Sequence, residues 1–243
     1  MNKNNTAILL FSRTATAEAA AKPLSIGKRS AESVAAFLIN HAKNLTAKTQ
    51  LPVFFFSEKQ QRGDTFGERF ANAFEDVFAK GFENVISIGN DCLTISTSDI
   101  LDAADALQTT PLTQSAIPQG GAVLGATNDG GAYLIGLQKD TFQKYLFQDI
   151  QWQTESVFDE LIKYVEQSTK NTENAIVFLA QKSDIDHVSD WKTTLQAIPL
   201  FLNKILTRLL FFLLPIPSER AISPVNASFL TSAIALRAPP HFQ

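Results

Sequence analysis

Short apolar runs alternate with amphipathic stretches along the first 110 residues of the chain. The runs are rich in Val, Ile, Leu and Phe and are bounded by turn residues, which is typical of buried strands. The predicted strands span residues 6–12, 51–57 and 83–89. Apolar residues three and four positions apart predict helices over residues 31–47, 65–79 and 98–107. This alternation predicts an α/β fold with helices flanking a mainly parallel central sheet.

The order of elements changes after residue 121. Two apolar runs, residues 122–126 and 132–137, are joined only by a short turn that contains Asp129 and two glycines. Strands joined by so short a turn pair antiparallel, so we expect some antiparallel pairing in the sheet. A short helix over 141–147, a helix over 155–166 that Thr154 caps, and a late strand over 174–180 are predicted to follow.

The chain divides by composition into residues 1–197, predicted to form one domain, and residues 198–243. Residues 198–217 are strongly apolar but are interrupted by Asn203, Lys204 and Arg208. Each charge near the centre of a membrane helix costs about 2.5–3.5 kcal/mol to insert, which disfavours a transmembrane span. We expect instead an amphipathic helix that docks on the domain, pairs with a second copy, or lies on a membrane surface.

Charge and cysteine content narrow the classes of function. A net charge of −3 provides no basic field for nucleic acid, so no nucleic-acid partner is expected. The lone Cys92 excludes a disulfide framework and a cysteine zinc cluster, and a small buried side chain is its expected role. The first apolar stretch is too short for a signal peptide, and we expect the protein to be cytoplasmic.

Two strands are followed by carboxylates at the point where each strand stops. Asp91 follows the strand at 83–89, and Asp129 follows the strand at 122–126. Ligands of open α/β sheets bind beyond the carboxyl ends of strands, so the two side chains could meet across neighbouring strands. Such a pair suits Mg²⁺ or Mn²⁺ holding substrate phosphates. Both residues are also ordinary turn formers, and their spacing alone favours that simpler role.

Residues 14–28, after the first strand, are small and polar and carry no helical or strand periodicity. With Arg13 before it and Lys22, Lys28 and Arg29 within or beside it, this segment could wrap phosphates. Composition alone favours a solvated loop with ordinary surface charges.

Four motifs in order resemble one known family. Residues 61–69 read QRGDTFGER, residues 88–92 IGNDC, residues 124–137 LGATNDGGAYLIGL, and residues 152–154 WQT. They resemble the motifs G-D-L-G-E-R, I-G-S-D-C-P, L-G-P-A-x-D-G-G-Y-Y-L-I-G-L and W-S-T. These motifs belong to the bacterial GT-A-type glycosyltransferase-like family associated with arsenosugar biosynthesis, within the nucleotide-diphospho-sugar transferase superfamily. The resemblance covers residues 6–180.

The resemblance implies a Rossmann-like GT-A fold, a nucleoside diphosphate-sugar donor, a small-molecule or glycan acceptor, and a divalent cofactor, Mg²⁺ or Mn²⁺. It implies that Asp91 is the metal-binding carboxylate. It makes Asp129 a second metal ligand or the catalytic group that orients or deprotonates the acceptor hydroxyl. The implied nucleotide-sugar-binding residues are Arg13, Lys22, Arg69, Gly130, Gly131 and Thr154.

The first loop departs from the family pattern. The family carries K-T-R-L there, whereas Lys22 of this chain is followed by Pro23 and Leu24, so the arginine is missing. Two alternatives therefore stay open. One is a nucleotidyltransferase of the same fold, which a first loop with Gly27 as its sole glycine disfavours. The other is a non-catalytic fold-mate that binds a partner through residues 198–217, which the retained Asp91 and Asp129 disfavour.

Overall fold

A computed structural model describes residues 5–22, 24, 28–108, 120–169 and 176–185 of the chain. Six strands and six helices make up this part. The strands are β1 (Thr6–Phe11), β2 (Val53–Phe56), β3 (Asn84–Ile88), β4 (Ala122–Thr127), β5 (Ala132–Gln138) and β6 (Ile176–Lys182). The helices are α1 (Ala15–Ala21), α2 (Lys28–Lys48), α3 (Phe66–Phe78), α4 (Thr97–Ala106), α5 (Lys144–Gln148) and α6 (Val157–Ser168).

The strands form one mixed sheet in the order β2-β1-β3-β5-β4-β6. β1 pairs parallel with β2 and β3, and β4 pairs parallel with β6, whereas β5 runs antiparallel to both β3 and β4. The predicted mainly parallel sheet with some antiparallel pairing is confirmed. The expectation that Asp91 and Asp129 follow neighbouring strands is wrong, because β5 lies between β3 and β4.

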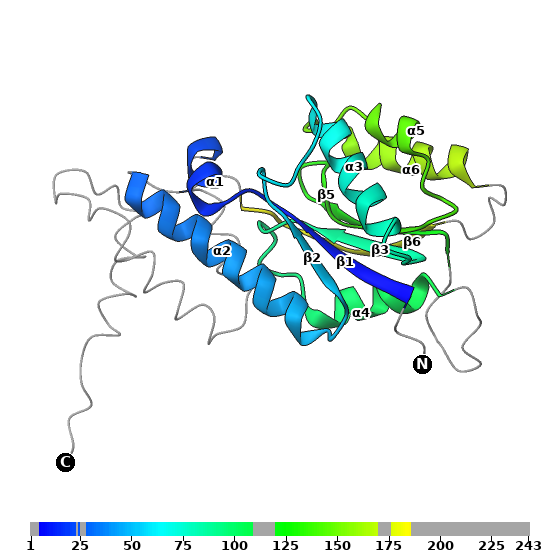
Figure 1. Ribbon diagram of the computed structural model, residues 1–243, viewed down its shortest axis with the longest axis horizontal. Helices are drawn as coiled ribbons and strands as arrows, with labels where there is room; N and C mark the ends of the chain where they lie inside the picture. The colour runs from blue at the N-terminus through cyan, green and yellow to red at the C-terminus, as the bar shows by residue number, and fades with distance from the viewer. Residues whose placement is uncertain (1–4, 23, 25–27, 109–119, 170–175, 186–243) are drawn as a thin grey trace, which may run out of the picture.

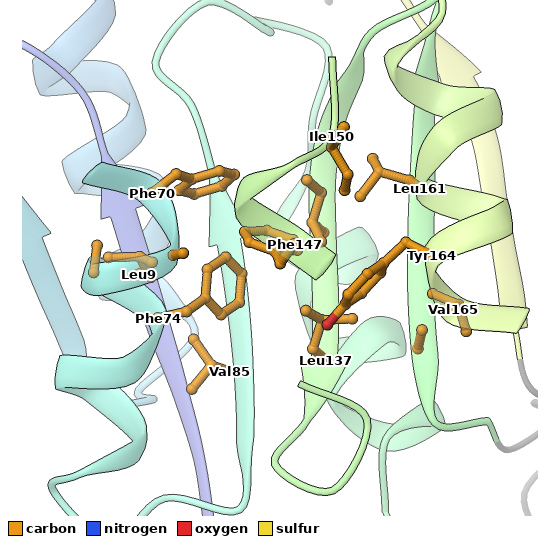
Figure 2. Close-up of a cluster of buried hydrophobic side chains, with 14 of the residues drawn as sticks. Leu9, Phe70, Phe74, Val85, Leu137, Phe147, Ile150, Leu161, Tyr164 and Val165 are labelled. Atoms are coloured by element: carbon orange, nitrogen blue, oxygen red, sulfur yellow. The ribbon is translucent and has the colours of Figure 1, made fainter. Parts of the chain in front are cut away.

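Helices cover both faces of the sheet. α3, α5 and α6 lie on one face, and α2 and α4 lie on the other (Figure 1). Alternate residues of β1 point to opposite faces, so Leu9 packs with the first layer and Ile8 with the second. The first layer is built from aromatic rings, with Phe74 and Phe147 fully buried at 5.2 Å between centroids (Figure 2). The high Phe content of the chain therefore fills this core.

Helix α3 was predicted well because its signals are local. Thr65 is its N-cap and forms a capping box with Glu68, and the apolar stripe of the helix is buried. A Cβ atom on Gly67 would lie 2.2 Å from the carbonyl oxygen of Gln148. Gly67 therefore lets α3 approach the last residue of α5 and the side chain of Trp152 closely.

Two local predictions are wrong. Residues 14–28 are not structureless, since Ala15–Ala21 form α1, in which alanines of high helix propensity predominate. Thr154 does not cap α6, because that helix begins at Val157 after Ser156, and the Thr154 hydroxyl donates instead to the carbonyl oxygen of Gln151. Helix α2 also begins at residue 28, three residues before its expected start.

The C-terminal predictions fall on residues 186–243, outside the described residues. The division at residue 197 and the docking of residues 198–217 stay predictions, as does the cytoplasmic location. Across the described ranges, no helix combines the length and apolar character that a membrane crossing requires.

Candidate functional site

A cavity of about 820 Å³ opens at the carboxyl ends of β1 and β3 and at the turn between β4 and β5. Ligands of α/β sheets bind at this edge. The predicted site residues that line it are Arg13, Lys22, Arg69, Asp91, Asp129, Gly131 and Thr154. Gly130 does not line it. The structure therefore brings together residues that are up to 141 positions apart in the sequence.

An ion-pair network crosses one side of this cavity. Lys22 Nζ lies 2.7 Å from Asp91 Oδ2 and 3.4 Å from Glu18 Oε1. Arg13 Nη1 lies 3.3 Å from Glu18 Oε2. Glu18, on α1, is buried and links the two cations. The wrongly predicted loop is thus the element that positions Lys22, because α1 places Glu18 and Lys22 one turn apart on the same side.

Asp91 is ionised in this network. Burial by itself would raise the pKa of the Asp91 carboxyl, but the charge of the Lys22 ammonium and its hydrogen bond outweigh burial and lower that pKa. The carboxylate therefore carries its negative charge at neutral pH. It is a negatively charged side chain directly after the end of β3, and its role as a metal ligand stays a prediction.

Hydrogen bonds that polar side chains donate tie together the strand ends beneath the cavity. The Ser12 hydroxyl lies 2.9 Å from Asn90 Oδ1, which joins the ends of β1 and β3. Gln61 Nε2 donates to the carbonyl oxygens of Ser12 at 2.8 Å and Phe56 at 3.1 Å. These two bonds join the end of β2 to the end of β1. Sequence reasoning missed these residues, although polar side chains directly after buried strands are a signal that could have found them.

Arg13 lies beside a second anchored position. The Thr14 amide and hydroxyl donate to the two carboxylate oxygens of Glu58, at 2.6 and 2.7 Å. These bonds fix the chain as it leaves β1, so that Arg13 and Glu58 both line the cavity. The loop after β2 therefore supports the cationic side of the site.

Asp129 also lines the cavity, from the β4–β5 turn. Its Oδ1 accepts a hydrogen bond from the Gly131 amide at 3.2 Å and a short one from the Thr127 hydroxyl. Asp129 is therefore both a turn former and a cavity residue. The roles of turn former and of site carboxylate do not exclude each other, because hydrogen bonds within the turn hold the Asp129 carboxylate in place.

Gly130 supports this turn rather than lining the cavity. Its φ is +89°, and a Cβ atom there would lie 1.9 Å from the carbonyl oxygen of Glu155. The Phe158 amide donates to the Gly130 carbonyl oxygen at 2.9 Å. The turn therefore packs directly on the start of α6, which requires glycine for conformation and for space.

Aromatic side chains form another wall of the cavity. Phe66 and Trp152 lie 5.5 Å apart between ring centroids, and both line the cavity with Phe11 and Phe70. The Trp152 indole donates to the carbonyl oxygen of Phe147 at 3.0 Å. The next residue, Gln153, has a φ of +65°, a conformation that is strained for a non-glycine residue. The loop at 152–154 is thus held in a strained conformation at the edge of the site.

Arg69 also reaches this side of the cavity. Its Nη1 donates to the carbonyl oxygen of Asp64 at 2.8 Å, which holds the guanidinium near the start of α3. Arg69 lies off the apolar stripe of α3, as predicted, and so stays available to the cavity.

The cavity contains side chains of the type that binds Mg²⁺ or Mn²⁺, namely carboxylates. Within the described residues, no three His, Cys, Asp or Glu side chains gather into a metal-binding group. Mg²⁺, however, is usually held by one or two carboxylates together with substrate phosphates, and Asp91 and Asp129 line the same cavity. Carboxylates of this kind are therefore present in the cavity, and Asp91 is in contact with Lys22.

Cys92 takes no part in chemistry here. It is buried, and burial raises the pKa of its thiol to about 12. The thiol is therefore protonated at neutral pH, which agrees with its predicted role as a small buried residue.

A family match covers the central part of the chain. Residues 26–154 match the sequence profile of a family described as "Uncharacterized protein conserved in bacteria (DUF2064)". The chain belongs to the DUF2064 family. The matched residues include Asp91, Asp129 and Arg69 but not Arg13 and Lys22. No curated protein matches this DUF2064 sequence.

Solved structures show the fold of this DUF2064 protein. A presumed nucleotide-diphospho-sugar transferase from Desulfovibrio desulfuricans G20 is similar with a TM-score of 0.67 and 18% identity, over 86% of this chain and 96% of that chain. At that identity the similarity shows the fold alone, and the predicted Rossmann-like fold of nucleotide-diphospho-sugar transferases is confirmed.

Two further structures are more distant. One is a glycosyltransferase involved in glycosylation of the major capsid of PBCV-1, with a TM-score of 0.42 and 9% identity over 72% of this chain and 81% of that one. The other is a CMP:2-keto-3-deoxy-manno-octonic acid synthetase complexed with CTP, with a TM-score of 0.41 and 10% identity over 84% of this chain and 99% of that one. Similarity at this level supports no inference.

Proposed function

We propose that the protein transfers a sugar from a nucleoside diphosphate-sugar to an acceptor hydroxyl, with Mg²⁺ or Mn²⁺ bound at Asp91. One observation carries the proposal: a single cavity at the carboxyl edge of the sheet is lined by the cations Arg13 and Lys22, next to β1 and α1, and by Asp129 in the β4–β5 turn. The charged diphosphate of a donor needs cationic side chains, and the hydroxyl of an acceptor needs a carboxylate that can take its proton.

The cationic side would bind the donor. Arg13 and Lys22 supply charge-assisted hydrogen-bond donors for phosphate oxygens. Asp91 would hold the divalent cation, which when bound neutralises the charge that develops on the leaving diphosphate. Arg13 and Lys22 would stabilise the same charge from the protein side. The leaving group is the nucleoside diphosphate.

The part of the cavity around Asp129 would bind the acceptor. Asp129 would orient the acceptor hydroxyl and take its proton as the new glycosidic bond forms. Hydrogen bonds from Thr127 and Gly131 to Asp129 Oδ1 hold this carboxylate in one orientation. Arg69 and Thr154 line the same cavity and would contact the sugar or acceptor through their polar groups.

Thermal unfolding with a nucleotide panel tests this function. UDP, GDP, CDP, dTDP and ADP are each added with and without Mn²⁺, at about 100 times the dissociation constant where binding occurs. Stabilisation by roughly 2.7 kcal/mol is then expected, which corresponds to a rise of roughly 5–10 °C in Tm. We expect one nucleotide to raise the Tm in a Mn²⁺-dependent manner.

Two variants localise the effect. Asp91→Ala should abolish the Mn²⁺-dependent rise, whereas Asp140→Ala should retain it, because Asp140 is exposed and does not line the cavity. If no nucleotide changes the Tm of the unmodified protein, the donor site is refuted and the non-catalytic fold-mate becomes the better account.

A further inference from the structure

The carboxylate assigned to the metal already holds a cation of the chain itself. Lys22 Nζ lies 2.7 Å from Asp91 Oδ2, and the pair lies within the cavity rather than on the outer surface. A divalent cation at the same oxygen would meet the Lys22 ammonium at close range. Because like charges at such distances repel, the two cations cannot share Asp91 in this arrangement.

The rest of the network allows Lys22 to leave Asp91 without losing every partner. Glu18 Oε1 lies 3.4 Å from Lys22 Nζ, and Glu18 is buried on the helix that precedes Lys22. The lysine side chain is a flexible four-carbon stem with a compact charge, so it can move while Glu18 remains near. The ammonium is therefore able to exchange Asp91 for another anion in the cavity.

A diphosphate is the anion that would complete this exchange. Two cations, Arg13 and Lys22, face two carboxylates, Glu18 and Asp91, so each cation of the network already contacts a carboxylate. A divalent cation alone would take the place of Lys22 at Asp91 and would bring no anion in exchange. A diphosphate alone would have to draw Lys22 from Asp91 and leave that carboxylate without its cation.

We propose that Lys22 is an internal counter-ion of Asp91, which the divalent cation displaces and which then moves to the donor diphosphate. Metal and nucleoside diphosphate consequently bind together, each poorly without the other. This inference rests on the proposed function and adds to it how the two ligands are coupled. No bond is made or broken in this exchange, which is a change of ion partners.

The decisive measurement is the affinity for Mn²⁺ without nucleotide, from the electron paramagnetic resonance signal of free Mn²⁺ during titration. Lys22→Met removes the competing ammonium, and Lys22→Gln removes the charge but keeps a polar side chain. Both variants should bind Mn²⁺ roughly tenfold more tightly than the unmodified protein, in the usual range of coupling between two sites. Lys139→Met removes an exposed lysine outside the cavity and should leave the affinity unchanged.

The second measurement uses the nucleotide that the thermal panel selects. By linkage, the factor by which Mn²⁺ tightens nucleotide binding equals the factor by which the nucleotide tightens Mn²⁺ binding. That factor should fall roughly tenfold in Lys22→Met, because the variant has no ammonium to exchange. Isothermal titration of the nucleotide, with and without Mn²⁺, measures it.

Two results separate this inference from the function beneath it. An unchanged or weaker Mn²⁺ affinity in both Lys22 variants, with Mn²⁺-dependent nucleotide binding intact in the unmodified protein, overturns the exchange and leaves the proposed function standing. Failure of the unmodified protein to bind any nucleotide with Mn²⁺ removes the proposed function, and the exchange with it.

Discussion

The two sides of the cavity are built in different ways. On the β1–α1 side, the functional groups Arg13, Lys22 and Asp91 are held by ion pairs between side chains. On the β4–β5 side, Asp129 is held by a turn whose position is set by backbone contacts to the start of α6. Side-chain ion pairs can be exchanged for ligand contacts, whereas a packed backbone cannot. The β1–α1 side, held by ion pairs, is therefore the adjustable side, and the β4–β5 side is preorganised by backbone packing.

The largest expected effect comes from breaking the rigid side. In Gly130→Ala the new Cβ atom would meet the Glu155 carbonyl oxygen at 1.9 Å, and the backbone would keep its φ of +89°. Overpacking and backbone strain together should lower the free energy of unfolding by about 3 kcal/mol. The Tm, followed by circular dichroism, should fall by roughly 6–12 °C.

Gly81→Ala is the matched control for this change. Gly81 has a similar φ of +95°, but a Cβ atom there would meet nothing within 4 Å. Gly81→Ala should therefore lower the free energy of unfolding only by the cost of positive φ for alanine, about 1–2 kcal/mol. If both alanine variants lose equal stability, the close packing of the β4–β5 turn on Glu155 does not hold that side in place.

A smaller effect is expected from the adjustable side. Glu18→Gln removes the charge that links Arg13 and Lys22, and both cations would lose a partner within the partly buried network. Because Arg13 and Lys22 keep some contact with water, we expect a loss of about 1–2 kcal/mol in the free energy of unfolding, measured in urea. Glu166→Gln, at an exposed position on α6, should change stability by less than about 0.5 kcal/mol. A Glu18→Gln protein as stable as the Glu166→Gln control would show that the network contributes nothing to folding.

The last expected effect concerns the reactivity of the buried thiol of Cys92, which directly follows Asp91 in the sequence. Burial raises the pKa of the Cys92 thiol to about 12, so little thiolate exists in the folded protein at pH 8. Labelling by a disulfide reagent at that pH should be at least about a hundredfold slower than in urea. Rapid labelling of the folded protein would show that the segment after Asp91 opens.

The same shift gives a pH dependence with a definite sign. The folded pKa of Cys92 lies above its unfolded value of about 8.5. The resulting stability is present below pH of about 8.5 and is lost as pH rises toward the folded value. Urea unfolding between pH of about 8 and 10 should therefore show a decline that Cys92→Ala reduces.

Local signals accounted for most of what could be predicted about the fold. The capping box of Thr65 and Glu68 and the apolar stripe of α3 lie within a few residues of each other, so that helix was predicted closely. α1 was missed because its sequence has small residues and no apolar stripe, and helix propensity was the signal that could have found it. Thr154 was misassigned because two hydroxyl residues, Thr154 and Ser156, precede α6, and spacing alone does not choose between them.

The candidate site was predicted in its parts but not in its connections. The carboxylates Asp91 and Asp129 were found from strand ends, and both line the cavity. Glu18 was missed entirely, although it links the two cations. Nothing near Glu18 in the sequence marks it, since its importance comes from burial beside partners that the fold supplies.

The sequence by itself determined where β1, β3 and β4 stop and where α3 begins, and therefore which polar residues lie at the ligand-binding edge of the sheet. Those features depend on burial patterns and hydrogen bonds that repeat over a few residues. Only the tertiary structure decided the strand order that separates Asp91 from Asp129, the pairing of Lys22 with Asp91, and the contact of Gly130 with Glu155. These are distances between segments far apart in the chain, and hydrophobic periodicity carries no information about which distant segments meet.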